Sequence, residues 1–169
     1  MLKVRKLTLK DHYKVFDLFS SSINSQFPEY SLKVREAIIK NRKFWSNASY
    51  KKRLQNKDRL LLGAFINNRL VGLIDTEMPF AGVSFASWLI VHSNHQKQNI
   101  GSSLVKAWEK KMLQLGAHLL YLLSAQRNVQ FYLKLGFQDV GIFRKAWFGL
   151  DDHIFTKLIA EPKEANFLK

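Results

Sequence analysis

A polar loop with a single glycine separates two apolar segments near the middle of the chain, within residues 91–105 (VHSNHQKQNIGSSLV). The apolar pattern after Gly101 predicts a helix, so the loop ends where the first backbone N–H groups of a helix have no partner inside it. Such groups attract anions, because the helix dipole also places partial positive charge there. The loop therefore predicts an anion-binding site, with phosphate as the first candidate ligand.

Other kinds of site find little support in the sequence. His92 and His95 are spaced like a pair on one helical turn, but they lie in a loop without a third ligand, so a zinc site is not expected. The chain has no cysteine, which excludes a thiolate metal site, a disulfide and a cysteine nucleophile. Neither the Gly-Lys-Ser/Thr loop that holds nucleotide phosphates nor the G-x-S-x-G turn of serine hydrolases occurs.

Size and composition favour one soluble domain. The 169 residues, 47% of them hydrophobic and 24% charged, suit a single compact domain over residues 1–169. No segment has the apolar length of a signal peptide, and none reaches the roughly 18 apolar residues that span a bilayer. We therefore expect a cytoplasmic protein without a membrane partner, either a monomer or a homodimer.

Net charge is the most unusual bulk property. The chain carries a formal charge of +14, which predicts attraction to phosphate-rich or other polyanionic partners. Much of this charge lies in residues 33–59, where only Glu36 and Asp58 are acidic. The basic residues of this region are Lys33, Arg35, Lys40, Arg42, Lys43, Lys51, Lys52, Arg53, Lys57 and Arg59. The basic region 33–59 is either the solvated face of a helix or a docking surface for RNA or an acidic protein.

Periodicity predicts the elements before this region. Residues 3–9 (KVRKLTL) alternate like a strand, and Asp11 then offers an N-cap for a helix. The apolar face expected for that helix is Tyr13, Val15, Phe16, Leu18 and Phe19. A break is expected at residues 20–31, where serines and a proline interrupt the pattern, followed by a second helix from near Leu32 to beyond Ile39 that extends into the basic region.

The elements around the polar loop are also predicted. Apolar runs on either side of Asn67-Asn68 indicate a hairpin, since asparagine tolerates a positive φ angle, and residues 83–91 follow as a third antiparallel strand. After the loop comes a helix that Gly116 ends. Its expected apolar face is Leu104, Val105, Trp108, Met112 and Leu115.

The last third of the chain completes a mixed fold. Residues 118–125 are continuously apolar and predict a buried strand, and a short helix closed by Gly136 in the left-handed conformation follows at residues 127–137. Two final strands are expected at residues 138–147 and 153–159. The order of elements predicts an α+β domain on a mixed, largely antiparallel sheet.

Two segments together resemble motifs of the GNAT superfamily of N-acetyltransferases. The first family motif runs Gln or Arg, two residues, Gly, one residue, Gly or Ala between a strand and a helix; Gln96 occupies its first position and Gly101 its last. Asn99 stands where the family usually has glycine, and asparagine is the least costly substitute at positive φ. In the second segment, residues 130–137 (QFYLKLGF), Tyr132 and the following Gly-Phe turn resemble the motif that closes the family's site.

The resemblance implies a fold of about seven strands flanked by about four helices, and it implies acetyl-CoA as cosubstrate without a metal. Backbone N–H groups from about Lys97 to Ser102 would hold the coenzyme's pyrophosphate, and the strand end before the loop would bind the pantetheine arm. The resemblance assigns the following residues to cofactor binding: Leu89, Ile90, Val91, Gln96, Lys97, Gln98, Asn99, Ile100, Gly101, Ser102, Asn128 and Tyr132.

The resemblance also implies catalytic roles. Tyr132 would give a proton to the departing thiolate, and the alternative is a half-buried tyrosine that packs one helix face. Many members of the family place a carboxylate on the strand before the loop, but this chain has Ser87 and Trp88 there. Asp75 and Glu77, which alternation places on one side of the preceding strand, are the candidates for a base or amine-binding group; otherwise they are solvated strand residues.

The function expected from the resemblance is acetyl transfer to a primary amine of a small molecule, peptide or protein by direct attack on the thioester. In the family, the loop that contains Trp147 and Phe148 and the segment 23–30 wall the acceptor pocket. An alternative function is a nucleic-acid- or ribosome-associated binding module on the same fold that uses the basic region 33–59.

Overall fold

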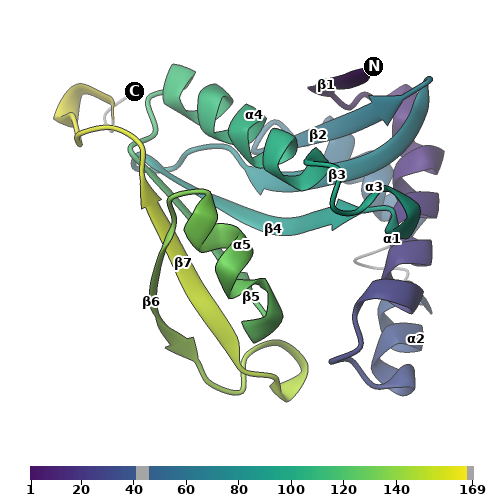
Figure 1. Ribbon diagram of the computed structural model, residues 1–169. Coiled ribbons are helices and arrows are strands. Elements are labelled where there is room, and N and C mark those ends of the chain that lie inside the picture. Colours follow the sequence, from purple (N-terminus) through teal and green to yellow (C-terminus); the bar gives the residue numbers. More distant parts are fainter. Residues whose placement is uncertain (41–45, 167–169) are drawn as a thin grey trace. The chain divides into compact units, whose positions relative to one another are not determined.

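The computed structural model describes residues 1–40 and 46–166 (Figure 1). Its strands are β1 (Leu2–Lys6), β2 (Arg59–Ile66), β3 (Arg69–Glu77), β4 (Val83–Val91), β5 (Leu119–Ser124), β6 (Gln138–Phe143) and β7 (Asp152–Leu158). Its α-helices are α1 (His12–Gln26), α2 (Leu32–Lys40), α3 (Asn47–Gln55), α4 (Ile100–Gln114) and α5 (Val129–Lys134). The strands form one sheet in the order β1-β2-β3-β4-β5-β7-β6.

The predicted α+β fold is confirmed. The β1–β2, β5–β7 and β6–β7 pairs are antiparallel, whereas β4 and β5 run parallel over four residue pairs, from Val83–Leu119 to Ala86–Leu122. The described residues contain seven strands as expected, and five α-helices where about four were expected, because the basic region forms a helix of its own. No helix in the described part of the chain has the length and apolar content needed to cross a membrane.

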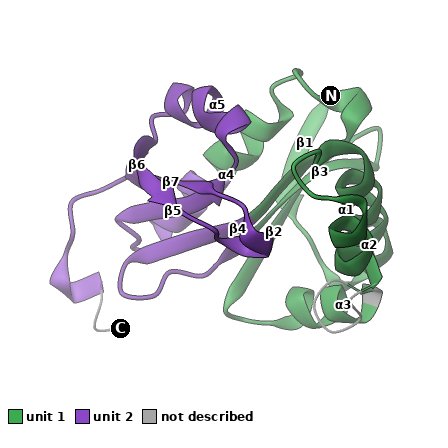
Figure 2. Cartoon of the chain, turned by 90° about the horizontal axis from the view of Figure 1, so that it is seen from below, with its two compact units in different colours: residues 1–75, 88–107 green, residues 76–87, 108–169 purple. Residues whose placement is uncertain are grey.

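Contacts between residues divide the chain into two compact units (Figure 2). Unit 1 comprises Met1–Asp75 and Trp88–Ala107, and unit 2 comprises Thr76–Ser87 and Trp108–Lys169. The second half of β4, the polar loop and the first half of α4 therefore belong to unit 1.

Unit 1 is organised around the two faces of β3. Leu73 belongs to a buried cluster with Val15 and Phe19 of α1, so one face of the strand lies against that helix. Side chains alternate along a strand, and a Cβ atom added to the neighbouring Gly72 would lie 3.0 Å from Ile100 and 3.1 Å from Leu104 of α4. Glycine at position 72 thus lets α4 approach the opposite face of the strand closely.

Helix α1 differs from its prediction in two respects. It continues to Gln26, through serines that were expected to break it, because their hydroxyl groups donate to carbonyl oxygens one turn earlier; Ser20 donates to Phe16 at 2.9 Å and Ser25 to Ser21 at 2.9 Å. Tyr13 was wrongly assigned to the apolar face, since it is 59% exposed. At 3.6 residues per turn, a residue two positions before Val15 lies about 200° around the helix from it, so Tyr13 is on the side opposite the buried residues.

Asp11 occupies the N-cap position of α1 as expected, but its side chain does not cap that helix. It accepts hydrogen bonds from the backbone N–H and the hydroxyl of Thr8 at 2.9 and 3.1 Å, and both of its oxygens bind the Arg5 guanidinium at 2.8 Å. The hydrogen bonds from Arg5 are the main reason why the pKa of the Asp11 carboxyl lies well below its ordinary value. The pair fixes the turn between β1 and α1.

The predicted hairpin is confirmed, with φ of 49° at Asn67 and 64° at Asn68. The second helix ends at Lys40, and its predicted extension reaches residues 41–45, which lie outside the described residues. A separate helix, α3, begins after Ser46, whose side chain accepts a hydrogen bond from the Ser49 N–H at 3.1 Å.

Aromatic residues hold the helices of unit 2 in place, and Tyr132 of α5 lies beside Phe155 of β7 with ring centroids 5.0 Å apart. Trp108 is fully buried, stacks near Phe137 with ring centroids 6.4 Å apart, and donates its indole N–H to Ser84 at 3.0 Å. Gly136 has the predicted positive φ, at 82°, and closes α5. Leu115 was wrongly expected on the apolar face of α4, because it follows Gln114, the last residue of that helix, and is 38% exposed.

The first of the last two strands is shorter than predicted, whereas β7 at Asp152–Leu158 agrees to within one residue with the strand expected at residues 153–159. The strand expected to reach residue 147 ends at Phe143, and residues 144–151 form a loop that Asp151 closes. The Asp151 carboxylate accepts from the Arg144 side chain and from the Lys145 N–H, both at 2.8 Å. These contacts turn the chain away from the sheet before β7 begins.

Candidate active site

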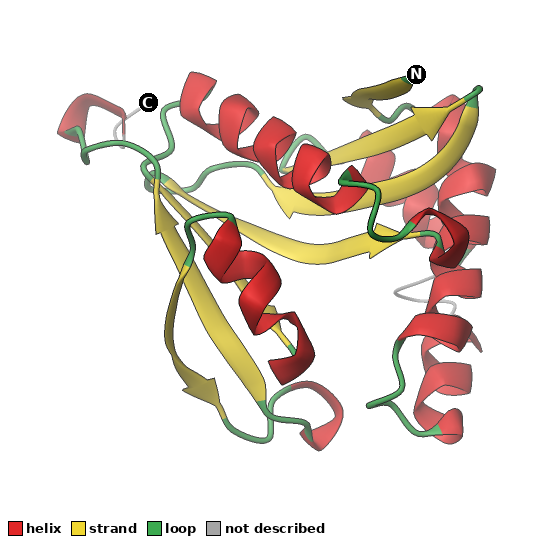
Figure 3. Cartoon of the chain, in the orientation of Figure 1, coloured by secondary structure: helices red, strands yellow, loops and turns green. Residues whose placement is uncertain are grey.

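The N-terminus of α4 presents a continuous run of unpaired backbone donors. In the described structure, the N–H groups of residues 97–102 have no hydrogen-bond acceptor, and the first paired one in this segment is that of Ser103, which donates to the Asn99 carbonyl at 3.0 Å. Figure 3 shows the short helical turn Ser93–His95 and the loop that lead from β4 into α4. Six neighbouring donors beside a helix N-terminus are the arrangement that the predicted anion site requires.

Two residues of this loop adopt backbone angles that side chains rarely allow. Asn99 has a φ of 59°, which confirms the conformation expected at the position where the family has glycine. Lys97 has a φ of 58°. The sequence gave no reason to expect this, because lysine, unlike glycine and asparagine, is not favoured at positive φ. Strained angles of this kind persist where the surrounding structure imposes them, often at ligand sites.

Two contacts within unit 1 hold the loop in place. The His92 N–H donates to the Val71 carbonyl of β3 at 2.8 Å, which fixes the start of the loop to the sheet. The Gln96 side-chain amide donates to the Gln26 side chain at the end of α1, at 2.7 Å. The sequence placed Gln96 in the coenzyme site, but gave no sign that Gln26, 70 positions earlier, would support it.

The predicted cofactor residues divide into two kinds. The side chains of Ile90 and Ile100 are each only 2% exposed and belong to the protein core, so only their backbone groups can meet a ligand. Gln96, Lys97, Gln98 and Asn99 are exposed. The parallel register of β4 with β5 ends at Ala86, so Leu89, Ile90 and Val91 lie in the part of β4 beyond that pairing.

Tyr132 lies on α5 in unit 2 and is only 6% exposed. Burial raises the pKa of its phenol to about 12, and a hydrogen bond with the Ser124 side chain acts in the opposite direction. The hydroxyl therefore stays protonated across the neutral pH range. Tyr132 is thus more deeply buried than the half-buried packing residue that was the alternative, and its ring lies beside those of Phe137 and Phe155, with centroids 5.7 and 5.0 Å away. Its role toward the departing thiolate stays a prediction.

Asn128 supports this tyrosine through Ser124. The Asn128 side-chain amide donates to the Ser124 hydroxyl oxygen at 2.9 Å, and Ser124 in turn bonds to Tyr132. Ser124 was not among the predicted site residues, because a serine at the end of an apolar strand carries no distinctive sequence signal. The direct contact of Asn128 with the cofactor stays a prediction.

Asp75 is held in a buried ion pair with two arginines. It has no exposed side-chain surface; Arg53 donates to one of its oxygens at 2.7 Å, and Arg59 donates two hydrogen bonds to the other at 2.9 and 2.7 Å. Both oxygens thus already accept charged hydrogen bonds. The fully buried Tyr50 lies in the same electrostatic environment, and burial raises the pKa of its phenol well above the ordinary value.

This ion pair also changes the interpretation of the basic region 33–59. Arg53 and Arg59 are largely buried against Asp75, a carboxylate outside that region, rather than displayed to solvent. Lys40 pairs with Glu36 at 3.1 Å, and Arg35 donates to the Asn24 carbonyl at 2.8 Å. Arg42 and Lys43 lie outside the described residues. Part of the charge counted from the sequence therefore stabilises the fold.

Glu77, at the end of β3, is exposed. Burial is the main cause that raises the pKa of the Tyr121 phenol, and the charge of Glu77 is the second cause. The Glu77 carboxylate therefore lies within electrostatic range of the Tyr121 side chain. Of the two predicted carboxylates, Glu77 is the one that solvent and a ligand can reach.

The histidines make no metal site in the described residues, where no group of three His, Cys, Asp or Glu side chains could hold an ion. His153 bonds through Nδ1 to Asp139 at 2.6 Å. Burial lowers the pKa of His92, and the charges of Arg69 and His95 add to this effect.

A family model described as an acetyltransferase (GNAT) domain matches residues 31–146. The match covers more than half of the chain and contains both the polar loop and Tyr132. The chain belongs to the GNAT acetyltransferase family. The family and enzyme class predicted from the two motifs are thereby confirmed.

Solved structures of GNAT proteins share the fold over nearly the whole chain. PaiA N-acetyltransferase from Thermoplasma acidophilum, solved in complex with coenzyme A, is 24% identical, with 94% of this chain and 99% of that one covered and a TM-score of 0.79. The ribosomal-protein-S18-alanine N-acetyltransferase from Escherichia coli is 18% identical, with 97% of each chain covered and a TM-score of 0.73. No curated protein sequence matches the chain.

Replacing Asp75 by Asn tests whether this residue stabilises the fold of the GNAT protein rather than acting as the base. The variant leaves two largely buried guanidinium groups without a counter-charge, so we expect a loss of about 3–5 kcal/mol in the free energy of unfolding, measured by urea denaturation. The matched variant Glu77→Gln at the exposed position should change it by less than about 0.5 kcal/mol. An Asp75→Asn protein of unchanged stability that has lost turnover would contradict the structural assignment.

Proposed function

We propose that this GNAT protein transfers the acetyl group of acetyl-CoA to a primary amine by direct attack of the amine on the thioester. The observation that carries the proposal is the run of unpaired N–H groups over residues 97–102 at the start of α4. The diphosphate of the coenzyme is an anion of the kind that such donors bind, and the Lys97 charge adds to the attraction. Unpaired donors gain full hydrogen bonds when the diphosphate arrives.

The proposed roles of the cofactor residues follow from their burial. Ile90 and Ile100 fix the backbone on both sides of the loop from within the core, and Gln96 holds the loop against α1. Backbone groups of residues 89–91 would then bind the pantetheine arm, as in the family pattern. Because these contacts depend on backbone geometry, they place little demand on side-chain identity.

In the proposed reaction a C–N bond forms, the C–S bond breaks, the amine loses one proton and sulfur leaves as a thiolate. We assign Tyr132 the role of hydrogen-bond donor to that sulfur. Complete proton transfer from a phenol of pKa about 12 to the thiolate of a thiol of pKa about 8.5 would cost about 5 kcal/mol. A donated hydrogen bond stabilises the developing charge without that cost.

Glu77 is the better candidate for the base, since both oxygens of Asp75 are occupied by arginines. A strong base is not required for every amine. Deprotonating a lysine-like amine of pKa about 10.4 at pH 7 costs about 4.6 kcal/mol, whereas an α-amine of pKa about 7.8 costs about 1.1 kcal/mol. Holding both reactants together supplies roughly 7–11 kcal/mol, so a water-relayed base suffices for the weaker amine.

The loop between β6 and β7 offers a contact for apolar parts of an acceptor. Trp147 and Phe148 are 61% and 49% exposed, and Phe148 has a positive φ of 61°. Exposed aromatic side chains held by a strained, hydrogen-bonded loop are typical of binding surfaces. We propose that they contact the amine-bearing acceptor, as the corresponding loop does in the family.

Acetyl-CoA at about 100 times its dissociation constant should stabilise the protein by about 2.7 kcal/mol, measured as a rise in melting temperature. Asn99→Gly should keep this rise, because glycine accepts a φ of 59°. Asn99→Val should reduce affinity by roughly tenfold or more, since a β-branched residue is strained by about 1–3 kcal/mol there. Absence of any rise for the unaltered protein at millimolar acetyl-CoA would overturn the proposal.

Tyr132→Phe should lower kcat by about 10²- to 10⁴-fold, because the donor to the leaving sulfur is lost. Its affinity for acetyl-CoA, measured by calorimetry, should change by less than about twofold, since the diphosphate contacts remain. Tyr50→Phe is the matched control, as it also removes a fully buried hydroxyl and should leave kcat unchanged. Unchanged kcat in Tyr132→Phe would remove this residue from the mechanism.

An acceptor screen tests the expected preference for weakly basic amines. A peptide with a free N-terminus should be acetylated with a higher kcat/KM than spermidine, whose amines are more basic and whose charge a +14 protein repels. Initial rates at pH 7 and 0.15 M salt measure the difference. Faster turnover of spermidine than of the peptide would contradict the preference.

A further inference from the structure

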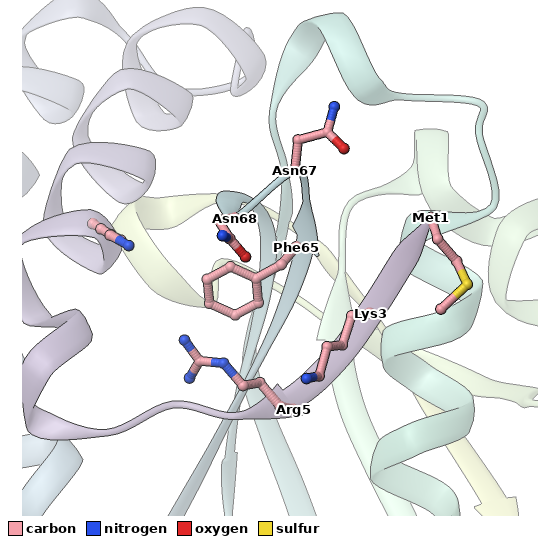
Figure 4. A pocket seen from close by; sticks show the side chains of 7 residues that line it. Met1, Lys3, Arg5, Phe65, Asn67 and Asn68 are labelled. Carbon is pink, nitrogen blue, oxygen red and sulfur yellow. The ribbon is translucent and has the colours of Figure 1, made fainter.

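A second concavity lies in unit 1 and contains no residue of the coenzyme loop (Figure 4). Its volume is about 490 Å³, and it is lined by Met1, Lys3, Arg5, Lys14, Phe65, Asn67 and Asn68. These residues come from β1 and the residue before it, from the first turn of α1, from the end of β2 and from the turn between β2 and β3. A cavity of this size suits a small molecule.

The fold brings the cationic side chains of this basic cavity together. Alternation along β1 places Lys3 and Arg5 on the same face, and Lys3 is the register partner of Phe65 on β2. Figure 4 shows the side chains of Lys3 and Arg5 on β1, and the Phe65 ring beside the Arg5 side chain. Lys14 reaches the cavity from α1, and the amides of Asn67 and Asn68 stand at the tip of the hairpin.

The lysines of the basic cavity have no compensating charge among the described residues. Lys3 and Lys14 are exposed and form no hydrogen bond or ion pair with any residue that the structure describes. None of the residues that line the cavity is a carboxylate. The positive charge there is consequently available to a ligand.

Arg5 is fixed in place before any ligand arrives. Its guanidinium donates to both oxygens of Asp11 at 2.8 Å and to the Lys6 carbonyl at 3.0 Å, and it lies 4.1 Å from the centroid of the Phe65 ring. These bonds use three of its five N–H groups and leave Nε–H and one Nη2–H for another acceptor. A rigid guanidinium loses little conformational entropy when it binds a phosphate oxygen.

We infer that the basic cavity binds a small ligand that carries a chain of phosphate groups, such as a nucleoside triphosphate or an inorganic polyphosphate. The two lysines and the remaining Arg5 donors supply charged contacts, and the asparagine amides supply neutral ones. The donors converge on one cavity rather than along a strip, whereas a nucleic-acid strand needs a groove that follows its backbone. This site is independent of the coenzyme loop and does not rest on acetyl transfer.

Calorimetry with sodium triphosphate at 0.05 and 0.15 M salt tests the inference. The protein should bind triphosphate, and the affinity should fall as salt rises. The Lys3→Gln/Lys14→Gln double variant should bind it roughly tenfold or more weakly, because two charged contacts are lost. The control Lys51→Gln/Lys52→Gln removes the same charge from exposed positions on α3 and should bind within about twofold of the unaltered protein.

Parallel titrations separate the sources of phosphate. ATP that binds more tightly than triphosphate, with the same dependence on Lys3 and Lys14, identifies a nucleotide as the natural ligand class; equal binding identifies the phosphate chain alone. If the Lys3→Gln/Lys14→Gln and Lys51→Gln/Lys52→Gln variants lose the same affinity for triphosphate, net charge alone explains the binding and the inference is wrong. The inference is also wrong if triphosphate does not bind while a 12-nucleotide RNA binds in a way that depends on Lys3 and Lys14. Melting temperatures of the variants verify that each remains folded.

Discussion

The need of backbone N–H groups for a hydrogen-bond partner is the constraint on which the site depends. A helix cannot pair its first donors internally, and in this chain the deficit extends over residues 97–102. No group in the described part of the chain accepts from them, so they are open to water or a ligand. The rest of unit 1 holds these donors in one arrangement, through the His92–Val71 hydrogen bond and the close packing of α4 on Gly72.

Charge is used in three different ways in unit 1. Asp75 holds Arg53 and Arg59 in a buried ion pair that ties α3 to β2 and β3. Asp11 holds Arg5 at the edge of the basic cavity, while Lys3 and Lys14 remain unpaired there among the described residues. The net charge of +14 therefore does not describe a uniform surface. Which side chains pair, and with what, decides where an anion can bind.

Features set by local backbone geometry could be predicted from the sequence. The positive φ angles at Asn67, Asn68 and Asn99 follow from the tolerance of asparagine for that conformation, and the left-handed Gly136 follows from helix termination. The two motifs then indicated the family. The extent of α1 was missed because serines can donate to carbonyls within a helix as well as break it.

Features set by tertiary contacts could not be predicted. The ion pairs of Asp75 join residues 22 and 16 positions apart on different elements, and no periodicity marks such a pairing. The support that Ser124 gives Tyr132 and that Gln26 gives Gln96 likewise depends on packing. The sequence therefore identified the residues of the motifs but not those that hold them in position.

The most direct measurement of the central claim is the response of individual amides to the coenzyme. In a two-dimensional ¹H–¹⁵N NMR titration with coenzyme A, the N–H groups of residues 97–102 should show the largest downfield shifts, as expected when unpaired donors bind a diphosphate. The neighbouring Ser103 amide, already bonded to Asn99, should shift less. Saturable binding that leaves the amides of 97–102 unshifted would contradict the assignment of this loop to the diphosphate.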